Sequence, residues 1–123
     1  MTNGPFFRRA QVADIDLILE FMREYYAFDG HHFDEKRSRA ALIGLLGNDS
    51  LGFVWLIEDG DVAVGYVVLT LGYSLELLGC DAFIDEFYLR EDYRGHGWGR
   101  QALAFVEDAA RSLRWAHRRG PAR

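Results

Sequence analysis

The stretch RGHGWGR at residues 94 to 100 has the residue types of an anion-binding site. Its glycines stand at every second position and lack a Cβ, so an anion can approach several backbone N–H groups at once. An apolar run with helical spacing follows, and the first N–H groups of a helix lie at the positive end of its dipole without intrahelical partners. Arg94 and Arg100 can add charge-assisted hydrogen bonds. The stretch therefore predicts a phosphate or pyrophosphate site, and a tight turn without a ligand is the alternative.

Two common phosphate-binding motifs do not fit this stretch. A Walker A loop requires Gly-Lys followed by Ser or Thr, and the only lysine of the chain is Lys36, far from the glycines. A dinucleotide-binding fingerprint requires G-x-G-x-x-G, whereas the spacing here is G-x-G-x-G. Too few residues follow Gly99 for the second half of such a fold. The anion would have to belong to another class of ligand.

A strand and a helix must hold the glycine stretch in place. Residues 82 to 90 (AFIDEFYLR) predict a strand before it, and apolar residues at helical spacing predict a helix from Gly99 to Leu113 after it. Earlier segments supply a strand at 6–12, a helix from Asp14 to Asp29-Gly30, a helix from Asp34 to Gly47-Asn48, the strands GFVWLIE and DVAVGYVVLTL joined at Asp59-Gly60, and a connector from Gly72 to Gly79. This order predicts an α/β (α+β) fold, a mainly antiparallel sheet with flanking helices.

Several residues at the ends of these elements favour the boundaries. Asp14 and Asp34 are suited to cap the two N-terminal helices, and Gly30 can adopt the left-handed conformation that ends the first. The pair Asp59-Gly60 is typical of a two-residue hairpin turn.

The composition excludes several classes of function. The chain has 123 residues, half of them apolar and 15% aromatic, which suits one globular domain. A net charge of -5 argues against sequence-independent binding of nucleic acid and is weakly compatible with a cationic substrate. The single cysteine, Cys80, cannot form an intrachain disulfide. No secretory leader and no apolar run of roughly 18 residues is present, so we expect a cytoplasmic protein that does not span a membrane.

The longer run IDEFYLREDYRGHGWGRQAL strongly resembles motif A of the GNAT superfamily of N-acetyltransferases. Arg94, Gly95, Gly97 and Gly99 match its R/Q-x-x-G-x-G/A pattern, and Tyr93 stands at its aromatic position. The order of elements also matches, over roughly residues 5 to 113. Within the superfamily, IDEFYL is most similar to the polyamine and amino-acid acetyltransferases.

The resemblance implies acetyl-CoA as co-substrate. We expect no metal, because the adjacent pair His31-His32 beside Asp34 does not converge well and has no i, i+4 partner. The pantetheine arm would lie along the backbone of Phe87, Tyr88 and Leu89, and the Leu89 N–H could hold the thioester oxygen. The remaining cofactor-binding residues would come from the glycine stretch: Arg94, Gly95, His96, Gly97, Trp98, Gly99 and Arg100.

The reaction requires an acceptor amine that has lost a proton, because a free alkyl amine has a pKa of about 10. Asp85 and Glu86 lie where the family often places the carboxylate that accepts this proton. Adjacent residues of a strand face opposite sides, so we expect only one of the two at the acceptor, and by similarity we favour Asp85. The alternative role for either is that of a salt-bridge partner.

The resemblance places the acceptor between the first two helices and the connector before the fourth strand. The substrate candidates are Glu24, Tyr25 and Tyr73, with Tyr26 and Asp29 as further possibilities. Core packing is the alternative role for Tyr25 and Tyr26. The predicted acceptor is a primary amine of a small molecule, which attacks the thioester directly.

The chain also departs from the family pattern. Family members continue for a fifth strand, a fourth helix and a final hairpin, so we expect a C-terminally truncated GNAT domain at 1–113 and an irregular tail at 114–123. No tyrosine follows Arg114, which leaves the family's general acid without a counterpart. An unpaired strand edge would favour a homodimer or strand-exchanged oligomer. The alternative function is a catalytically impaired module that binds CoA or dimerises.

Overall fold

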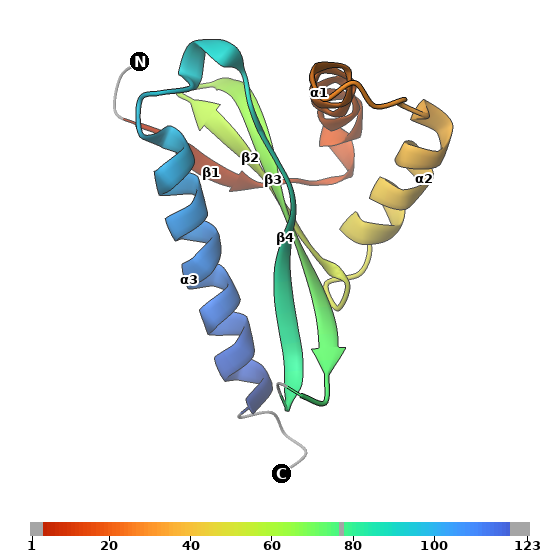
Figure 1. Cartoon of the computed structure of the whole chain (residues 1–123), viewed down its shortest axis with the longest axis vertical. Helices are drawn as coiled ribbons and strands as arrows, with labels where there is room; N and C mark the ends of the chain where they lie inside the picture. The colour runs from red at the N-terminus through yellow and green to blue at the C-terminus, as the bar shows by residue number, and fades with distance from the viewer. Residues whose placement is uncertain (1–3, 77, 119–123) are drawn as a thin grey trace.

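A four-stranded antiparallel sheet forms the middle layer of the protein (Figure 1). We describe residues 4–76 and 78–118 of a computed structural model. The strands, in spatial order, are β1 (Phe6–Arg9), β2 (Gly52–Asp59), β3 (Val62–Ser74) and β4 (Gly79–Leu89). Helices α1 (Ile15–Phe28) and α2 (Glu35–Leu46) cover one face, and α3 (Trp98–Arg118) covers the other. The predicted mixed fold with a mainly antiparallel sheet and flanking helices is confirmed.

The strands are apolar on both faces because both faces are covered. In β2, Val54 and Leu56 pack toward α1 and α2, whereas Trp55 and Ile57 pack toward α3. This alternation is the two-residue period of a strand. Gly65 of β3 allows a close approach to β4, because a Cβ there would lie 2.2 Å from the Tyr88 carbonyl oxygen.

The helix caps agree with the sequence only in part. The Asp34 carboxylate accepts the Arg37 N–H at 3.1 Å and caps α2, and Gly30 has a φ of 74° after α1. Asp14 stands at the N-cap position of α1 as predicted, but its carboxylate makes no capping hydrogen bond there and instead binds the Arg8 guanidinium and the Gln11 N–H. An arginine on the neighbouring strand offers this carboxylate two charge-assisted hydrogen bonds, which are stronger than one bond to a helix amide.

Several predicted boundaries shift by a few residues. The first strand ends at Arg9, and the β2–β3 turn consists of Gly60 and Asp61 because Asp59 pairs with Val62. The connector predicted at 72–79 is shorter, since β3 extends to Ser74 and β4 begins at Gly79.

Helix α3 continues to Arg118, so the prediction of an irregular tail was wrong for residues 114–118. The missing apolar period there does not end the helix, because arginine and alanine are good helix formers. Residues 119–123 lie outside the described part of the chain.

Strand β4 lies at one edge of the sheet, and within the described residues no strand pairs with its outer side. Apolar side chains are exposed around the β3–β4 hairpin, among them Tyr73, Leu75, Leu78 and Phe83. The predicted self-association through this edge remains a prediction. None of the described helices has the length and apolar character that crossing a membrane requires.

Candidate functional site

A β-bulge in β4 brings the two candidate carboxylates to the same side of the sheet. Val68 pairs with Glu86 but Leu69 pairs with Ile84, so Asp85 is the extra residue. Asp85 and Glu86 consequently line one cavity, and the expectation that only one of them faces it was wrong. The strict alternation behind that expectation fails at a bulge, and bulges often lie beside active sites.

Two tyrosines donate hydrogen bonds to the Glu86 carboxylate. The Tyr26 hydroxyl of α1 lies 2.5 Å from one oxygen, and the Tyr66 hydroxyl of β3 lies 2.7 Å from the other. Burial and the nearby Glu86 carboxylate raise the pKa of both tyrosines, which keeps them protonated as donors. Glu86 is therefore held in a fixed position as an acceptor of hydrogen bonds.

Asp85 differs from Glu86 in its surroundings. Its side chain is exposed, and within residues 4–76 and 78–118 it accepts no hydrogen bond and forms no ion pair. Its oxygens are available to a ligand or to water.

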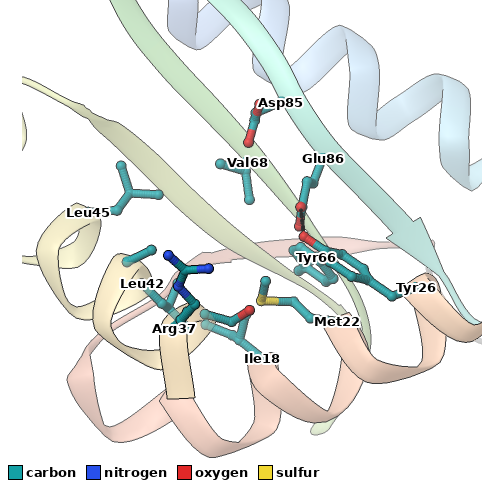
Figure 2. Close-up of a pocket in the computed structure, with 12 residues that line it drawn as sticks. Ile18, Met22, Tyr26, Arg37, Leu42, Leu45, Tyr66, Val68, Asp85 and Glu86 are labelled. Atoms are coloured by element: carbon teal, nitrogen blue, oxygen red, sulfur yellow. Dashed lines mark hydrogen bonds between the residues drawn. The ribbon is translucent and has the colours of Figure 1, made fainter. Parts of the chain in front are cut away.

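The cavity beside these carboxylates has a volume of about 430 Å³, within the usual range for a small-molecule site. Helices α1 and α2 form one wall and strands β3 and β4 the other (Figure 2). Half of its lining residues are apolar, namely Ile18, Met22, Ala41, Leu42, Leu45 and Val68, and the other half carry polar groups, namely Tyr26, Arg37, Ser38, Tyr66, Asp85 and Glu86. We call it the acceptor cavity.

The outer edge of β4 has backbone groups that pair with no strand of the described residues. The Arg90 N–H donates to the Val64 carbonyl at 2.9 Å, which places Arg90 and, by alternation, Tyr88 in the hydrogen-bonded pairs with β3. The N–H groups of Phe87 and Leu89 therefore point outward, away from β3, whereas the N–H group of Tyr88 points toward β3. Of the three predicted pantetheine contacts, the backbone geometry suits Phe87 and Leu89.

The loop after β4 is fixed by side chains. Arg94 Nε donates to the Leu89 carbonyl at 2.6 Å, and its guanidinium lies over the rings of Phe28 and Tyr88. The Tyr93 hydroxyl donates to Asp59 at 2.7 Å. Arg94 thus ties the loop to the strand, a role that the sequence did not indicate.

The glycines of the loop adopt conformations that only glycine accepts readily. Gly95 has a φ of 79° and Gly97 a φ of 85°, and a Cβ at either would meet no protein atom within 4 Å. The backbone N–H groups of residues 95 to 100 donate to no acceptor within the described part of the chain. A row of unused donors at a helix start suits an anion.

A second cavity of about 420 Å³ connects this loop to β4. It is lined by Tyr25, Phe28, Asp29, Phe87, Tyr88, Leu89, Arg94, Gly95 and Gly99. We call it the coenzyme groove. Tyr25 and Tyr26 are consecutive on α1, and Glu86 and Phe87 are consecutive on β4, so the groove and the acceptor cavity are adjacent.

The remaining predicted residues are placed as follows. Trp98 is 4% exposed and packs against Tyr93, so only its backbone is available to a ligand, while His96 and Arg100 are exposed. Within the described residues Arg100 has no ion-pair partner. Tyr73 is 77% exposed on the distant β3–β4 hairpin and reaches neither cavity.

Glu24 and Tyr25 lie nearer to the coenzyme groove than predicted. Glu24 binds Arg90 at 3.0 Å and accepts the Tyr88 hydroxyl at 2.7 Å, which joins α1 to β4. Burial and this bond to Glu24 raise the pKa of Tyr88 to about 12. Tyr25 lines the groove and not the acceptor cavity.

Sequence reasoning missed Tyr66 and Arg37 at the acceptor cavity. Tyr66 precedes Val68 by two residues and therefore lies on the same face of β3. This spacing could have indicated from the sequence that both face the same cavity. Arg37, Ala41 and Leu45 stand four residues apart on α2 and share one helix face.

The comparisons with known proteins agree with this geometry. The Acetyltransferase (GNAT) family matches residues 15–119. An integron cassette protein, HFX_CASS3, from the mobile metagenome of Cole Harbour Salt Marsh is 37% identical, with a TM-score of 0.83 over 87% of this chain and 70% of that chain. Comparison with curated proteins gave no match.

Two more distant structures have the same fold. A predicted acetyltransferase with acetyl-CoA from Clostridium acetobutylicum is 17% identical, with a TM-score of 0.79 over 89% of this chain and 75% of that chain. A possible acetyltransferase from Clostridium difficile 630 is 19% identical, with a TM-score of 0.76 over 87% of this chain and 71% of that chain. On the match over residues 15–119, this chain belongs to the GNAT family of acetyltransferases.

Proposed function

We propose that the protein transfers the acetyl group of acetyl-CoA to a primary amine of a small molecule. The observation that carries this proposal is the adjacency of the two cavities. One is bordered by unused backbone donors that suit a phosphorylated ligand, and the other contains two carboxylates. A thioester in the coenzyme groove and an amine in the acceptor cavity would meet beside Glu86 and Phe87.

The described residues fit acetyl-CoA. The pyrophosphate would accept hydrogen bonds from the N–H groups of residues 95 to 100, with Arg100 adding a charge-assisted bond. The pantetheine arm would bind the outward backbone of Phe87, in the manner of an added strand. The Leu89 N–H would donate to the thioester oxygen and stabilise the negative charge that develops there.

In the proposed reaction the acceptor binds as an ammonium ion and first loses a proton to Asp85, directly or through water. The neutral nitrogen then attacks the thioester carbon, a C–N bond forms and the C–S bond breaks. After the attack the nitrogen still carries one proton more than the amide product, and it releases this proton. The CoA thiolate leaves and takes a proton from water. The products are the acetylated amine and CoA, with net release of one proton.

Glu86 has a different part in this proposal. Its oxygens already accept two tyrosine hydroxyls, so it serves as a fixed negative charge that attracts the ammonium. Asp85 is exposed and without a partner in the described chain, so it can accept a proton and pass it to solvent.

The test is a turnover assay with acetyl-CoA and a panel of primary amines, in which free CoA thiol and the mass of the acetylated amine are both measured. We expect amine-dependent release of thiol in step with product. Folded protein that releases no thiol with any amine would contradict the proposal.

A further inference from the structure

The acceptor cavity carries a positive charge opposite its carboxylates. Arg37 of α2 lines the cavity, across from Asp85 and Glu86 on β4 (Figure 2). A guanidinium at this place disfavours a second positive charge on the ligand, because like charges repel. Arg37 therefore bears on which amine the cavity accepts.

The Arg37 guanidinium is available to a ligand. Within the described residues it has no ion pair, and none joins it to Asp85 or Glu86. The nearest carboxylate in sequence, that of Asp34, accepts the Arg37 backbone N–H as the cap of α2. Two other arginines of α1 and α2 do form ion pairs: Arg39 with Asp16, and Arg23 with Glu35.

The surface between the two charged ends is apolar. The apolar side chains that line the cavity are those of Ile18, Met22, Leu42, Leu45 and Val68. The Glu86 carboxylate already accepts hydrogen bonds from two tyrosine hydroxyls. The cavity therefore offers a carboxylate with free oxygens, an apolar wall and an unpaired guanidinium. These match, in the same order, the amine, the apolar body and the anionic group of a single molecule.

We propose, on the basis of the proposed function, that the acceptor is a primary amine whose apolar body ends in a carboxylate or similar anion, which Arg37 binds. The amine lies at Asp85 and Glu86, the body contacts the apolar wall, and the anion accepts hydrogen bonds from the guanidinium. Diamines of the same length are disfavoured, because their second ammonium would approach Arg37.

The test uses three primary amines with the same number of carbon atoms that differ only at the far end: 6-aminohexanoate, hexylamine and hexane-1,6-diamine. Binding of each to the protein with CoA present is measured by calorimetry, and acetylation of each is measured as kcat/KM. We expect 6-aminohexanoate to bind about tenfold more tightly than hexylamine, the gain of one charge-assisted bond. We expect the diamine to bind most weakly.

The variant Arg37→Met removes the charge and keeps an apolar side chain of similar length. We expect it to erase the preference for 6-aminohexanoate while the affinity for hexylamine stays within about twofold. Lys36→Met is the matched control, since it removes a neighbouring charge on α2 that does not line the cavity, and it should leave the preference intact.

Two results would overturn the inference. One is equal or weaker binding of 6-aminohexanoate than of hexylamine, and the other is an unchanged preference in Arg37→Met. Its failure is distinct from failure of the proposed function. Acetylation of all three amines without preference overturns only the inference. Tight binding of 6-aminohexanoate that depends on Arg37, without any acetylation, overturns the proposed function and leaves the binding of the anion by Arg37 in place.

Discussion

The coenzyme groove and the acceptor cavity lie side by side and share α1 and β4, but they offer a ligand different groups. Beside Tyr25, Phe28 and Asp29 at the end of α1, the groove is formed by one continuous segment from Phe87 to Gly99, whose backbone is held by glycine conformations. The acceptor cavity depends on side chains from α1, α2, β3 and β4. Recognition through the backbone leaves a local sequence motif, whereas recognition through dispersed side chains does not. Substitutions on the two sides should consequently affect binding of the two substrates separately.

The largest expected effect on the acceptor side is that of Asp85→Asn. Loss of the proton acceptor should lower kcat by about 100-fold to 1,000-fold, while the Kd of acetyl-CoA stays unchanged. Steady-state kinetics and calorimetry measure the two quantities. Asp108→Asn, an exposed position on α3, is the control. A kcat within threefold of the parent would remove Asp85 from the mechanism.

A pair of Tyr→Phe variants should separate the two regions. Tyr66→Phe removes the hydroxyl that donates a hydrogen bond to Glu86. This variant should lower kcat/KM for the amine by about tenfold, without changing the affinity for acetyl-CoA. Tyr93→Phe frees the glycine loop from Asp59 and should weaken acetyl-CoA binding by a few fold. Equal effects of both variants on both substrates would show that the two regions are not independent.

Arg100→Ala tests the charge at the start of α3. It should raise the Kd of acetyl-CoA about fivefold, because Arg100 is exposed and its bond to a phosphate would be partly screened. The amine KM should not change. Arg111→Ala, on the same helix and paired with Asp108, is the matched control, and the same rise in both variants would contradict a specific role.

The smallest effect concerns Glu24, which joins α1 to β4 between the two regions. Burial opposes its ionisation, but hydrogen bonds from Arg90 and Tyr88 outweigh burial and hold the pKa of Glu24 below its usual value. A depressed pKa contributes stability above the unfolded pKa of about 4.3, and this stability is lost as pH falls through the folded pKa.

The Tm of Glu24→Gln should accordingly lie about 2–4 °C below that of the parent at pH 7. The difference should begin to shrink as pH falls below the unfolded pKa of about 4.3, and it should vanish once pH lies below the folded pKa, where the parent carboxylate is also protonated. Thermal unfolding followed by circular dichroism at several pH values measures it, with Glu107→Gln on α3 as control. A difference that does not vary with pH would contradict the ionic role.

The sequence predicted the element order, the sheet type and the glycine loop because each rests on local patterns. It placed Asp34 as a cap and Gly30 as a helix end correctly for the same reason. It failed where contacts between elements decide: the Asp14 carboxylate binds Arg8 on β1 and no helix amide, and the bulge at Asp85 follows from the pairing of two strands. Tyr66 and Arg37 reach the acceptor cavity only through the packing of the layers.

The central claim is that the glycine loop binds the pyrophosphate of acetyl-CoA, and one calorimetric titration tests it most directly. Acetyl-CoA is titrated into the parent, into Gly97→Val and into Gly79→Val, a positive-φ glycine at the opposite end of β4. We predict binding to the parent and to Gly79→Val, and a loss of about 100-fold or more in Gly97→Val, whose side chain would enter the space of the phosphates. Equal binding to all three proteins, or none to the folded parent, would contradict the claim.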